Sequence, residues 1–278
     1  MKLRAVLAFA LCLFVSLGPH AAEKTDLSQA WRAEAKSLET IADKLSDYVP
    51  DTANPQARQE LFDFIYSNIA MAYFGVAYSD PAYPDFYPAL NQVFRVGWPN
   101  PDDAYYYVPV DDDGVYKIAG YRGTVRLIDF QISAGLAAKD GTGLWGPAQA
   151  NYSIDDVKIT DNGWFEVVLS AQRPQGYAGN WWKLDKGATW IMVRQRAYDW
   201  AHEIDGRFGI ERLDRPAIRP RLTADQIAAK LKRVSVWAET WTRLNLTYAK
   251  ASYEKGKVNQ FQLRDFGSAG VFTGRVEV

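Results

Sequence analysis

Residues 105–124 read YYYVPVDDDGVYKIAGYRGT, and this stretch decides the fold that the sequence predicts. Two short runs rich in Val, Ile and Tyr each end in a turn signal, first Asp111-Asp112-Asp113-Gly114 and then Gly120-Tyr121-Arg122-Gly123. Such residues suit a pleated, half-buried surface, whereas clusters of Asp and Gly favour tight turns. The pattern is typical of an antiparallel β-sheet, and the acidic cluster is interpreted as a turn because it lacks the spacing of a calcium loop.

The same alternation of β-rich runs and turn signals continues to residue 214. Strands are predicted at Tyr105–Val110, Val115–Ala119, Thr124–Ser133, Ile154–Thr160, Trp164–Ser170, Thr189–Tyr198 and Phe208–Leu213. Asp161-Asn162-Gly163 adds a strong hairpin signal. Because no helical pattern interrupts these runs, residues 98–214 predict a β-sandwich or jelly-roll-like domain.

A helical segment at residues 23–97 precedes this domain. Apolar side chains recur at three- and four-residue steps from Leu27 to Tyr48, which predicts one amphipathic helix. Asn54-Pro55 opens a second helix, with a capping residue followed by proline at the first helical position. A short third helix is expected near Phe86 to Phe94.

A long helix follows the domain. After an extended linker at 215–222, residues 223–256 predict an amphipathic helix in which Thr223 and Gln226 form a capping box. Its apolar stripe, which includes Trp237 and Trp241, also offers a surface for a homo-oligomer. Residues 257–278 predict C-terminal strands. The predicted fold class is therefore mainly β, with an N-terminal helical segment and a long C-terminal helix.

The first 22 residues are typical of a signal peptide. Lys2 and Arg4 precede the apolar run Ala5–Leu17, and cleavage is expected after Ala21 or Ala22. The run is too short to span a bilayer, and no later stretch is apolar enough to do so. We therefore expect a periplasmic or secreted protein without stable membrane insertion.

The expected mature chain contains no cysteine and one histidine, His202, because Cys12 and His20 lie in the signal peptide. This excludes thiol catalysis and zinc sites built from Cys and His, and neither a metal nor a cofactor is predicted. The signal peptide holds two basic residues and no acidic one, which leaves 30 basic against 33 acidic residues. Nothing in this balance indicates a nucleic-acid partner.

Two arginines stand in a strongly apolar strand. Residues 189–193 are largely apolar, and a spacing of two places Arg194 and Arg196 on one face. A buried arginine needs a partner, and a structural ion pair is predicted with one of Asp199, Glu166 and Asp129. The alternative is a guanidinium that faces a cavity and binds a carboxylate or another anion, with Arg122 joining it from a hairpin loop.

Aromatic residues are abundant, with 10 Trp and 16 Tyr. They suit a large sandwich core, and they also suit ring-shaped ligands. The predicted ligand-binding residues are Asn100, Arg122, Trp181, Arg194 and Tyr198. Candidate catalytic residues are Asp102, Tyr106, Asp199 and His202, because carboxylates, tyrosine and one histidine can transfer protons.

The β-region also contains a distinctive series of short sequence motifs. They include Asn100-Pro101-Asp102, Gly120-Tyr121-Arg122-Gly123-Thr124, Gly163-Trp164-Phe165-Glu166, Asn180-Trp181 and Val193-Arg194-Gln195. Over roughly residues 98–214 the chain resembles the bacterial family called domain of unknown function 1214, whose members often carry domain of unknown function 1254. The resemblance implies a β-sandwich and supplies no reaction.

These observations lead to two main functional hypotheses, beside a structural or assembly module that would use the Trp-bearing C-terminal helix at an interface. The first is an exported accessory protein that binds a small amphipathic or ring-containing ligand, supported by the aromatic content and the missing catalytic signatures. The alternative is a hydrolase or lyase that uses carboxylate, Tyr and Arg on a carbohydrate or aromatic substrate.

Overall fold

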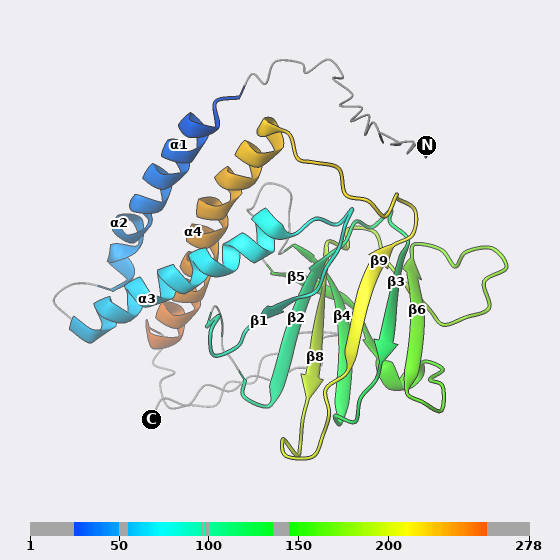
Figure 1. The fold of residues 1–278 in the computed structure, drawn as a ribbon. Helices are drawn as coiled ribbons and strands as arrows, with labels where there is room; N and C mark the ends of the chain where they lie inside the picture. Colours follow the sequence, from blue (N-terminus) through cyan, green and yellow to red (C-terminus); the bar gives the residue numbers. More distant parts are fainter. Residues whose placement is uncertain (1–24, 50–54, 96, 98–99, 136–144, 255–278) are drawn as a thin grey trace, which may run out of the picture.

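The computed structural model describes residues 25–49, 55–95, 97, 100–135 and 145–254. The predicted signal peptide and the predicted strands at 257–278 lie outside these residues. Within them, the protein is mainly β with helices on both sides of the β-region in sequence, which confirms the predicted fold class (Figure 1).

The β-region forms two sheets. The first has the strand order β1 (Tyr87–Ala89), β2 (Asp103–Pro109), β8 (Trp190–Arg196), β4 (Leu127–Gly135) and β5 (Trp145–Ser153). The second has the order β7 (Trp181–Lys183), β6 (Trp164–Ser170), β3 (Tyr116–Tyr121) and β9 (Arg207–Arg212). Only the pairing of β6 with β7 is parallel among the described strands.

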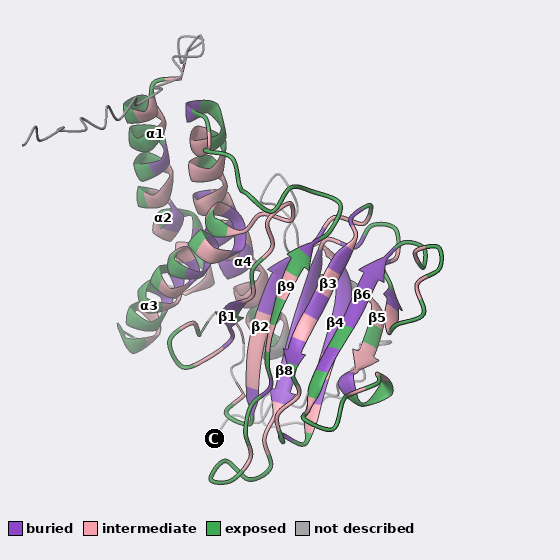
Figure 2. Ribbon diagram, turned by 45° about the vertical axis from the view of Figure 1, so that its right-hand side comes forward, coloured by how far each residue is buried: buried purple, intermediate pink, exposed green. Residues whose placement is uncertain are grey.

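A hydrophobic core fills the space between the two sheets. Ile118, Phe130, Phe165 and Val193 are almost fully buried there, and each comes from a different strand. Their neighbours in sequence point to the opposite faces, as the period of two requires. The two sheets therefore form a sandwich, with buried residues concentrated along its strands (Figure 2).

The helices form a layer against the outer face of the five-stranded sheet. They are α1 (Leu27–Glu39), α2 (Ile41–Leu45), η1 (Ser46–Tyr48), α3 (Pro55–Ala72), the π-helix η2 (Tyr73–Tyr78) and α4 (Ala224–Glu254). A second core joins this layer to the sheet, with Trp237 and Trp241 of α4 in the same buried cluster as Tyr107 and Trp190. None of the described helices has the length and apolar character needed to cross a membrane.

The C-terminal helix begins as predicted. The Thr223 hydroxyl accepts from the Gln226 amide at 3.3 Å, and the Thr223 amide donates to Gln226 Oε1 at 2.9 Å, which completes the capping box. Trp237 and Trp241 of its apolar stripe are 2% and 5% exposed. Both side chains pack against other parts of the same chain. A homo-oligomer would therefore have to form through another surface.

Three predicted elements were wrong. Residues 154–160 hold the 3-10 helix η3 (Ile154–Asp156) instead of a strand, and the strand that precedes them is β5. The turn at Gly163 does form, with a φ of 84° and a bond from its amide to Thr160 O at 2.8 Å. The helix expected near 86–94 is replaced by β1, and the helix expected at 27–48 breaks at Thr40.

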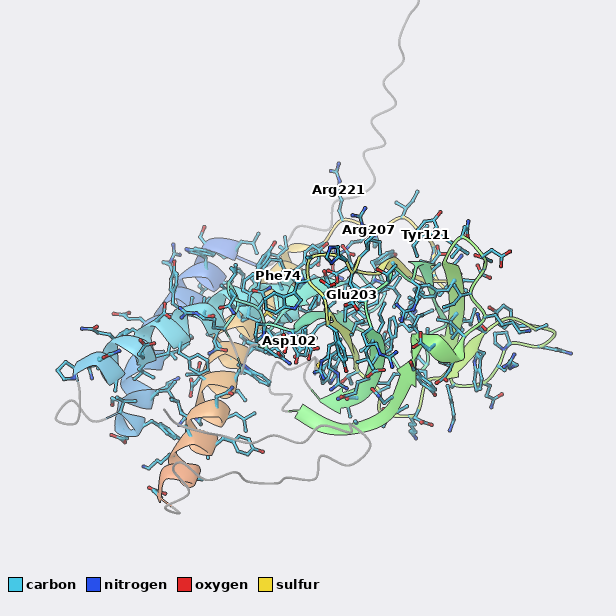
Figure 3. All side chains as sticks on the ribbon, turned by 90° about the horizontal axis from the view of Figure 1, so that it is seen from below. Phe74, Asp102, Tyr121, Glu203, Arg207 and Arg221 are labelled. Carbon is cyan, nitrogen blue, oxygen red and sulfur yellow. The ribbon has the colours of Figure 1, made fainter. Side chains whose placement is uncertain are left out.

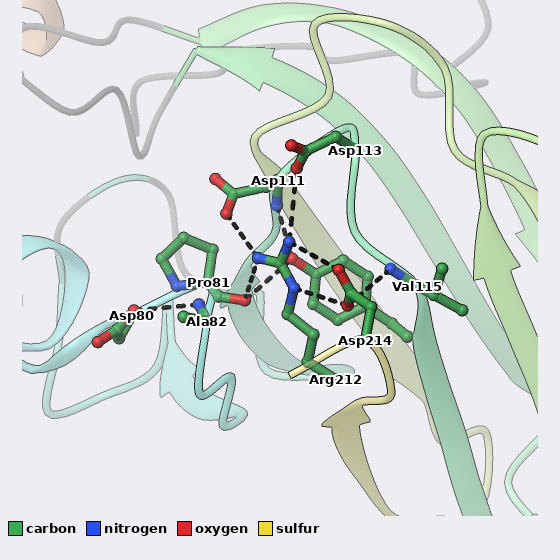
Figure 4. A network of polar contacts seen from close by, with 9 residues as sticks. Asp80, Pro81, Ala82, Asp111, Asp113, Val115, Arg212 and Asp214 are labelled. Carbon is green, nitrogen blue, oxygen red and sulfur yellow. Dashed lines mark hydrogen bonds and ion pairs between the residues drawn. The ribbon is translucent and has the colours of Figure 1, made fainter. Parts of the chain in front are cut away.

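One buried arginine joins the helical segment to the sandwich (Figure 4). The Arg212 side chain is 1% exposed and pairs with Asp111 at 2.6 Å and with Asp214 at 2.9 Å. It also donates to Pro81 O, in the segment between η2 and β1, at 3.3 Å. The acidic turn at 111–114 therefore forms as predicted, with Gly114 N bonded to Asp111 O, and its first carboxylate neutralises Arg212.

We predict that Arg212→Met lowers the free energy of unfolding by about 3 kcal/mol, because it leaves several carboxylates without their cation. Arg207→Met is the matched control, since Arg207 lies on the same strand and is exposed. The control should change stability by less than about 0.5 kcal/mol. Urea unfolding of both variants measures the difference, and equal effects would contradict this account.

The same network predicts a pH dependence. Burial alone would raise the pKa of Asp214, but hydrogen bonds from Arg212 and from the Val115 amide outweigh it and lower the pKa below the usual 3.8. A carboxyl with a lowered folded-state pKa stabilises the fold above its unfolded value and loses this effect as the pH falls through the folded value. Asp214→Asn should therefore cost stability at pH 7 and progressively less below pH 3.8. Urea unfolding at several pH values tests this, and a cost independent of pH would refute it.

Candidate functional site

An open cleft lies at the end of the sandwich where β2 begins and β8 ends. It has a volume of about 450 Å³ and is lined by Asn100, Asp102, Arg196, Ala197 and Tyr198. Three of these were predicted as site residues, namely Asn100, Asp102 and Tyr198. In Figure 3, Asp102 and Glu203 are labelled at this end of the sheet.

Turn chemistry shapes one wall of the cleft. The Asn100 side chain accepts from the Asp102 amide at 3.0 Å, and the Asn100 carbonyl accepts from the Asp103 amide at 3.3 Å. Asn100 thereby fixes the turn that leads into β2, as expected of an Asn-Pro-Asp sequence. The Ala197 amide donates to Asp102 O at 3.1 Å and joins this wall to the end of β8.

A buried carboxylate, Asp103, holds the Arg196 side chain that lines the cleft. Asp103 has a side chain only 1% exposed and binds both Nε and Nη2 of Arg196 at 2.7 Å. It also accepts from Asn100 at 2.9 Å and from the Tyr105 hydroxyl at 3.0 Å. The hydrogen bonds to Asp103 raise the pKa of Arg196, so this side chain stays charged. Burial, assisted by the charge of Asp103, raises the pKa of Tyr105 to about 12.

Sequence reasoning missed Asp103 and expected other partners for the two arginines. A structural ion pair does hold Arg196, but its carboxylate is Asp103 and not Asp199, Glu166 or Asp129. The alternation along β2 puts Asp103 on the same face as Tyr105, and the pairing of β2 with β8 sets Asp103 directly opposite Arg196. The register itself cannot be read from one strand alone.

Arg194 lies deeper on the same face of β8. It is 8% exposed, and its Nη2 donates to Gln131 Oε1 at 3.2 Å and to Asn151 Oδ1 at 3.5 Å. Within the part of the chain that the structure describes, its Nε is buried without a hydrogen-bond partner and no ion pair holds the side chain. Asp129, one of the predicted carboxylates, stands directly opposite Arg194 in the register, and the charge of Arg194 acts to lower the pKa of Asp129 against a larger rise caused by burial. Among the described residues the two side chains form no direct ion pair.

Asp199 and His202 form a pair outside the cleft. His202 Nδ1 lies 2.8 Å from Asp199 Oδ2, so one of the predicted orienting carboxylates is present. Both side chains are exposed, at 81% and 56%. Such a pair sits in bulk solvent, where neither the hydrogen bond nor the charges gain from a low dielectric.

The remaining predicted residues lie elsewhere. Tyr106 packs toward the core between the sheets. Arg122 does not join Arg194 and instead pairs with Asp155 at 3.0 Å. Trp181, on β7, donates to Ser170 Oγ at 3.0 Å. Of the predicted catalytic residues, only Asp199 and His202 are brought together, and they lie apart from Asp102 in the cleft and from Tyr106. The described part of the chain holds no cluster of three or more acidic, Cys or His side chains placed to bind a metal.

Comparisons with known proteins support the fold and assign no activity. No family model and no curated protein matches the chain. The crystal structure of an uncharacterised protein from Burkholderia cenocepacia is similar, with a TM-score of 0.74 and 25% identity over 89% of this chain and 67% of that one. The VPA0106 protein from Vibrio parahaemolyticus aligns over 42% of this chain and 32% of its own at 14% identity, and its TM-score of 0.28 carries no argument.

Neighbouring aspartates provide a matched test of the site. Asp103→Asn should lower the free energy of unfolding by about 2 kcal/mol, because hydrogen bonds to a buried charged carboxylate are weakened. Asp102→Asn should change it by less than about 0.5 kcal/mol, since this side chain is exposed and makes no bond within the described residues. Thermal and urea unfolding of the two variants measure this difference. A larger effect of Asp102→Asn would contradict the assignment of Asp103 as the structural carboxylate.

Proposed function

We propose that the protein is an exported accessory protein that binds a small, ring-containing ligand in the cleft between β2 and β8. The observation that carries this proposal is the convergence of Asn100, Asp102, Arg196 and Tyr198 around one cleft. Its volume of about 450 Å³ falls within the range of small-molecule sites, about 300–1,000 Å³.

The chemistry of the lining suits a ring that carries hydroxyl or other polar groups. Tyr198 is 72% exposed, which leaves its flat ring accessible for stacking. Asp102 offers a carboxylate acceptor, and Arg196 keeps one amino group of its guanidinium outside the bonds to Asp103. Opposite charges on the two sides of the cleft can orient a polar ring.

Binding is favoured over catalysis. A hydrolase or lyase of the predicted type needs Asp102 together with Tyr106, Arg122 or Asp199 around one substrate, and of these only Asp102 lines the cleft. Export and membership of the domain of unknown function 1214 family form part of the proposal. Export is supported by the apolar run at residues 5–17, and family membership by the short sequence motifs of residues 98–214.

A thermal-shift screen of sugars, aromatic acids and lipids tests ligand binding. We expect at least one ring-containing compound to raise the Tm, and Tyr198→Ala should weaken its binding about tenfold, the loss of about 1.4 kcal/mol of contact. Tyr121→Ala is the control, because Tyr121 is also exposed but lies on β3. A screen without any stabilising compound, or equal binding by both variants, would reject the proposal.

Export is tested separately on the full chain. Expression in a Gram-negative host followed by cell fractionation should place the protein in the periplasm, and its mass should correspond to cleavage after Ala21 or Ala22. Lys2→Glu together with Arg4→Glu should retain the protein in the cytoplasm with the uncleaved mass. Periplasmic protein of uncleaved mass would contradict the predicted signal peptide.

A further inference from the structure

We propose that the groove between the first turns of α1 and α4 binds a medium-chain fatty acid, with its carboxylate at Arg32. The groove has a volume of about 420 Å³ and is open to solvent. It is lined by Leu27, Ser28, Trp31, Arg32, Ile227 and Leu231. This inference goes beyond the proposed function, because none of these residues lines the cleft between β2 and β8.

The groove has two defined ends because α1 and α4 run side by side in the same direction (Figure 1). Where both helices begin, the Thr25 hydroxyl donates to the Asp225 carboxylate. Further along, the amide and the hydroxyl of Ser235 donate to the two carboxylate oxygens of Glu34 at 2.7 and 2.9 Å. Glu34 is only 6% exposed, so this contact closes the groove. The helical rise from Leu27 to Glu34 gives a length of about 10 Å.

Apolar side chains form the two walls of the groove. Residues four apart on a helix lie on one line, so Leu27 and Trp31 form a row on α1. Ile227 and Leu231 form a second row on α4. Trp31 belongs to the apolar pattern of α1, yet it is 63% exposed. A large apolar side chain thus remains open to solvent beside three others, which is the usual character of a site for an apolar ligand.

A polar, positively charged row follows one side of the groove. Ser28 and Arg32 belong to the lining, and Lys36 continues their row one turn further along α1. All three are polar and two are cations, and Arg32 forms no ion pair with any residue that the structure describes. A guanidinium binds a carboxylate through two parallel hydrogen bonds. A ligand with an apolar chain and one negative charge therefore complements both the walls and the edge of this groove.

Two carboxylates near the groove already have partners. Asp26 caps α1 and accepts from the Ser28 and Gln29 amides at 2.9 and 3.2 Å. Asp225 lies in the first turn of α4 and accepts from the Thr25 hydroxyl. Each of these carboxylates also offsets the positive end of a helix dipole. The charge available to a ligand along the groove is therefore that of the cationic row.

The size of the groove favours a small ligand over a protein partner. A stable protein interface buries about 800 Å² on each partner. The groove offers six side chains over about two turns of each helix, which is too little for such an interface. Its volume of about 420 Å³ instead falls within the range of small-molecule sites, about 300–1,000 Å³. A single flexible chain fits a short groove of this shape.

The test is isothermal titration calorimetry of the full chain with sodium decanoate, kept monomeric and at constant ionic strength. Decanoate should bind saturably and about tenfold more tightly than octanoate, because two further methylene groups are buried. Decan-1-ol should bind more weakly than decanoate, since it lacks the charge that Arg32 recognises. An absence of saturable binding, or equal affinities for decanoate and decan-1-ol, overturns the proposal.

Matched variants locate the carboxylate and the chain. Arg32→Gln should weaken decanoate binding about fivefold and leave decan-1-ol binding unchanged, whereas Arg207→Gln, on exposed β9, should affect neither. Trp31→Ala should weaken the binding of both ligands about fivefold. Trp200→Ala is its control, because Trp200 is similarly exposed, at 65%, but lies between β8 and β9.

A further variant separates the groove from the cleft. Tyr198→Ala should preserve decanoate binding, so failure of the cleft proposal leaves this test intact. Loss of decanoate binding in Tyr198→Ala, or equal effects of Arg32→Gln and Arg207→Gln, overturns a fatty-acid site between α1 and α4.

Discussion

Strand β8 is the constraint on which the rest of the structure depends. It is bonded to β2 on one side and to β4 on the other, and both of its faces are covered. Ile191 and Val193 must fill the core between the sheets, while Trp190 and Met192 must fit the helical layer. This leaves only the end of the strand for polar groups. The ion pair of Arg196 with Asp103 makes that end compatible with burial, and it also supports the cleft.

The fold was largely predictable because its signals are local. The capping box at Thr223 and Gln226 and the turn at Gly163 depend on a few adjacent residues, and both formed as expected. The predicted strand at 154–160 failed because Ile154 is buried in the core through a 3-10 turn, so tertiary packing overrode its β-propensity. Likewise, β1 forms at 87–89 because β2 offers it a free edge.

The site was only partly predictable, because it depends on register. Asn100, Asp102 and Tyr198 flank the ends of two strands, and once β2 pairs with β8 they necessarily meet. The partner of Arg196 and the neighbours of Arg194 arise from which residues stand opposite each other across the sheet. A one-residue slip would exchange these faces, and no single strand encodes the alignment. The candidates Tyr106, Arg122 and Trp181 satisfied the compositional pattern but lie on other faces or strands.

The bond from Arg212 to Pro81 has a consequence for cooperativity. It ties three segments that are far apart in sequence, the loop after η2, the acidic turn and the end of β9, to one buried guanidinium. Separation of the helical layer from the sandwich would remove the Pro81 carbonyl and expose the core around Tyr107 and Trp190. Local opening has a low free energy only where few buried contacts are lost. Helices and sandwich should thus exchange their amide hydrogens as one unit, despite the change from helical to β-rich sequence.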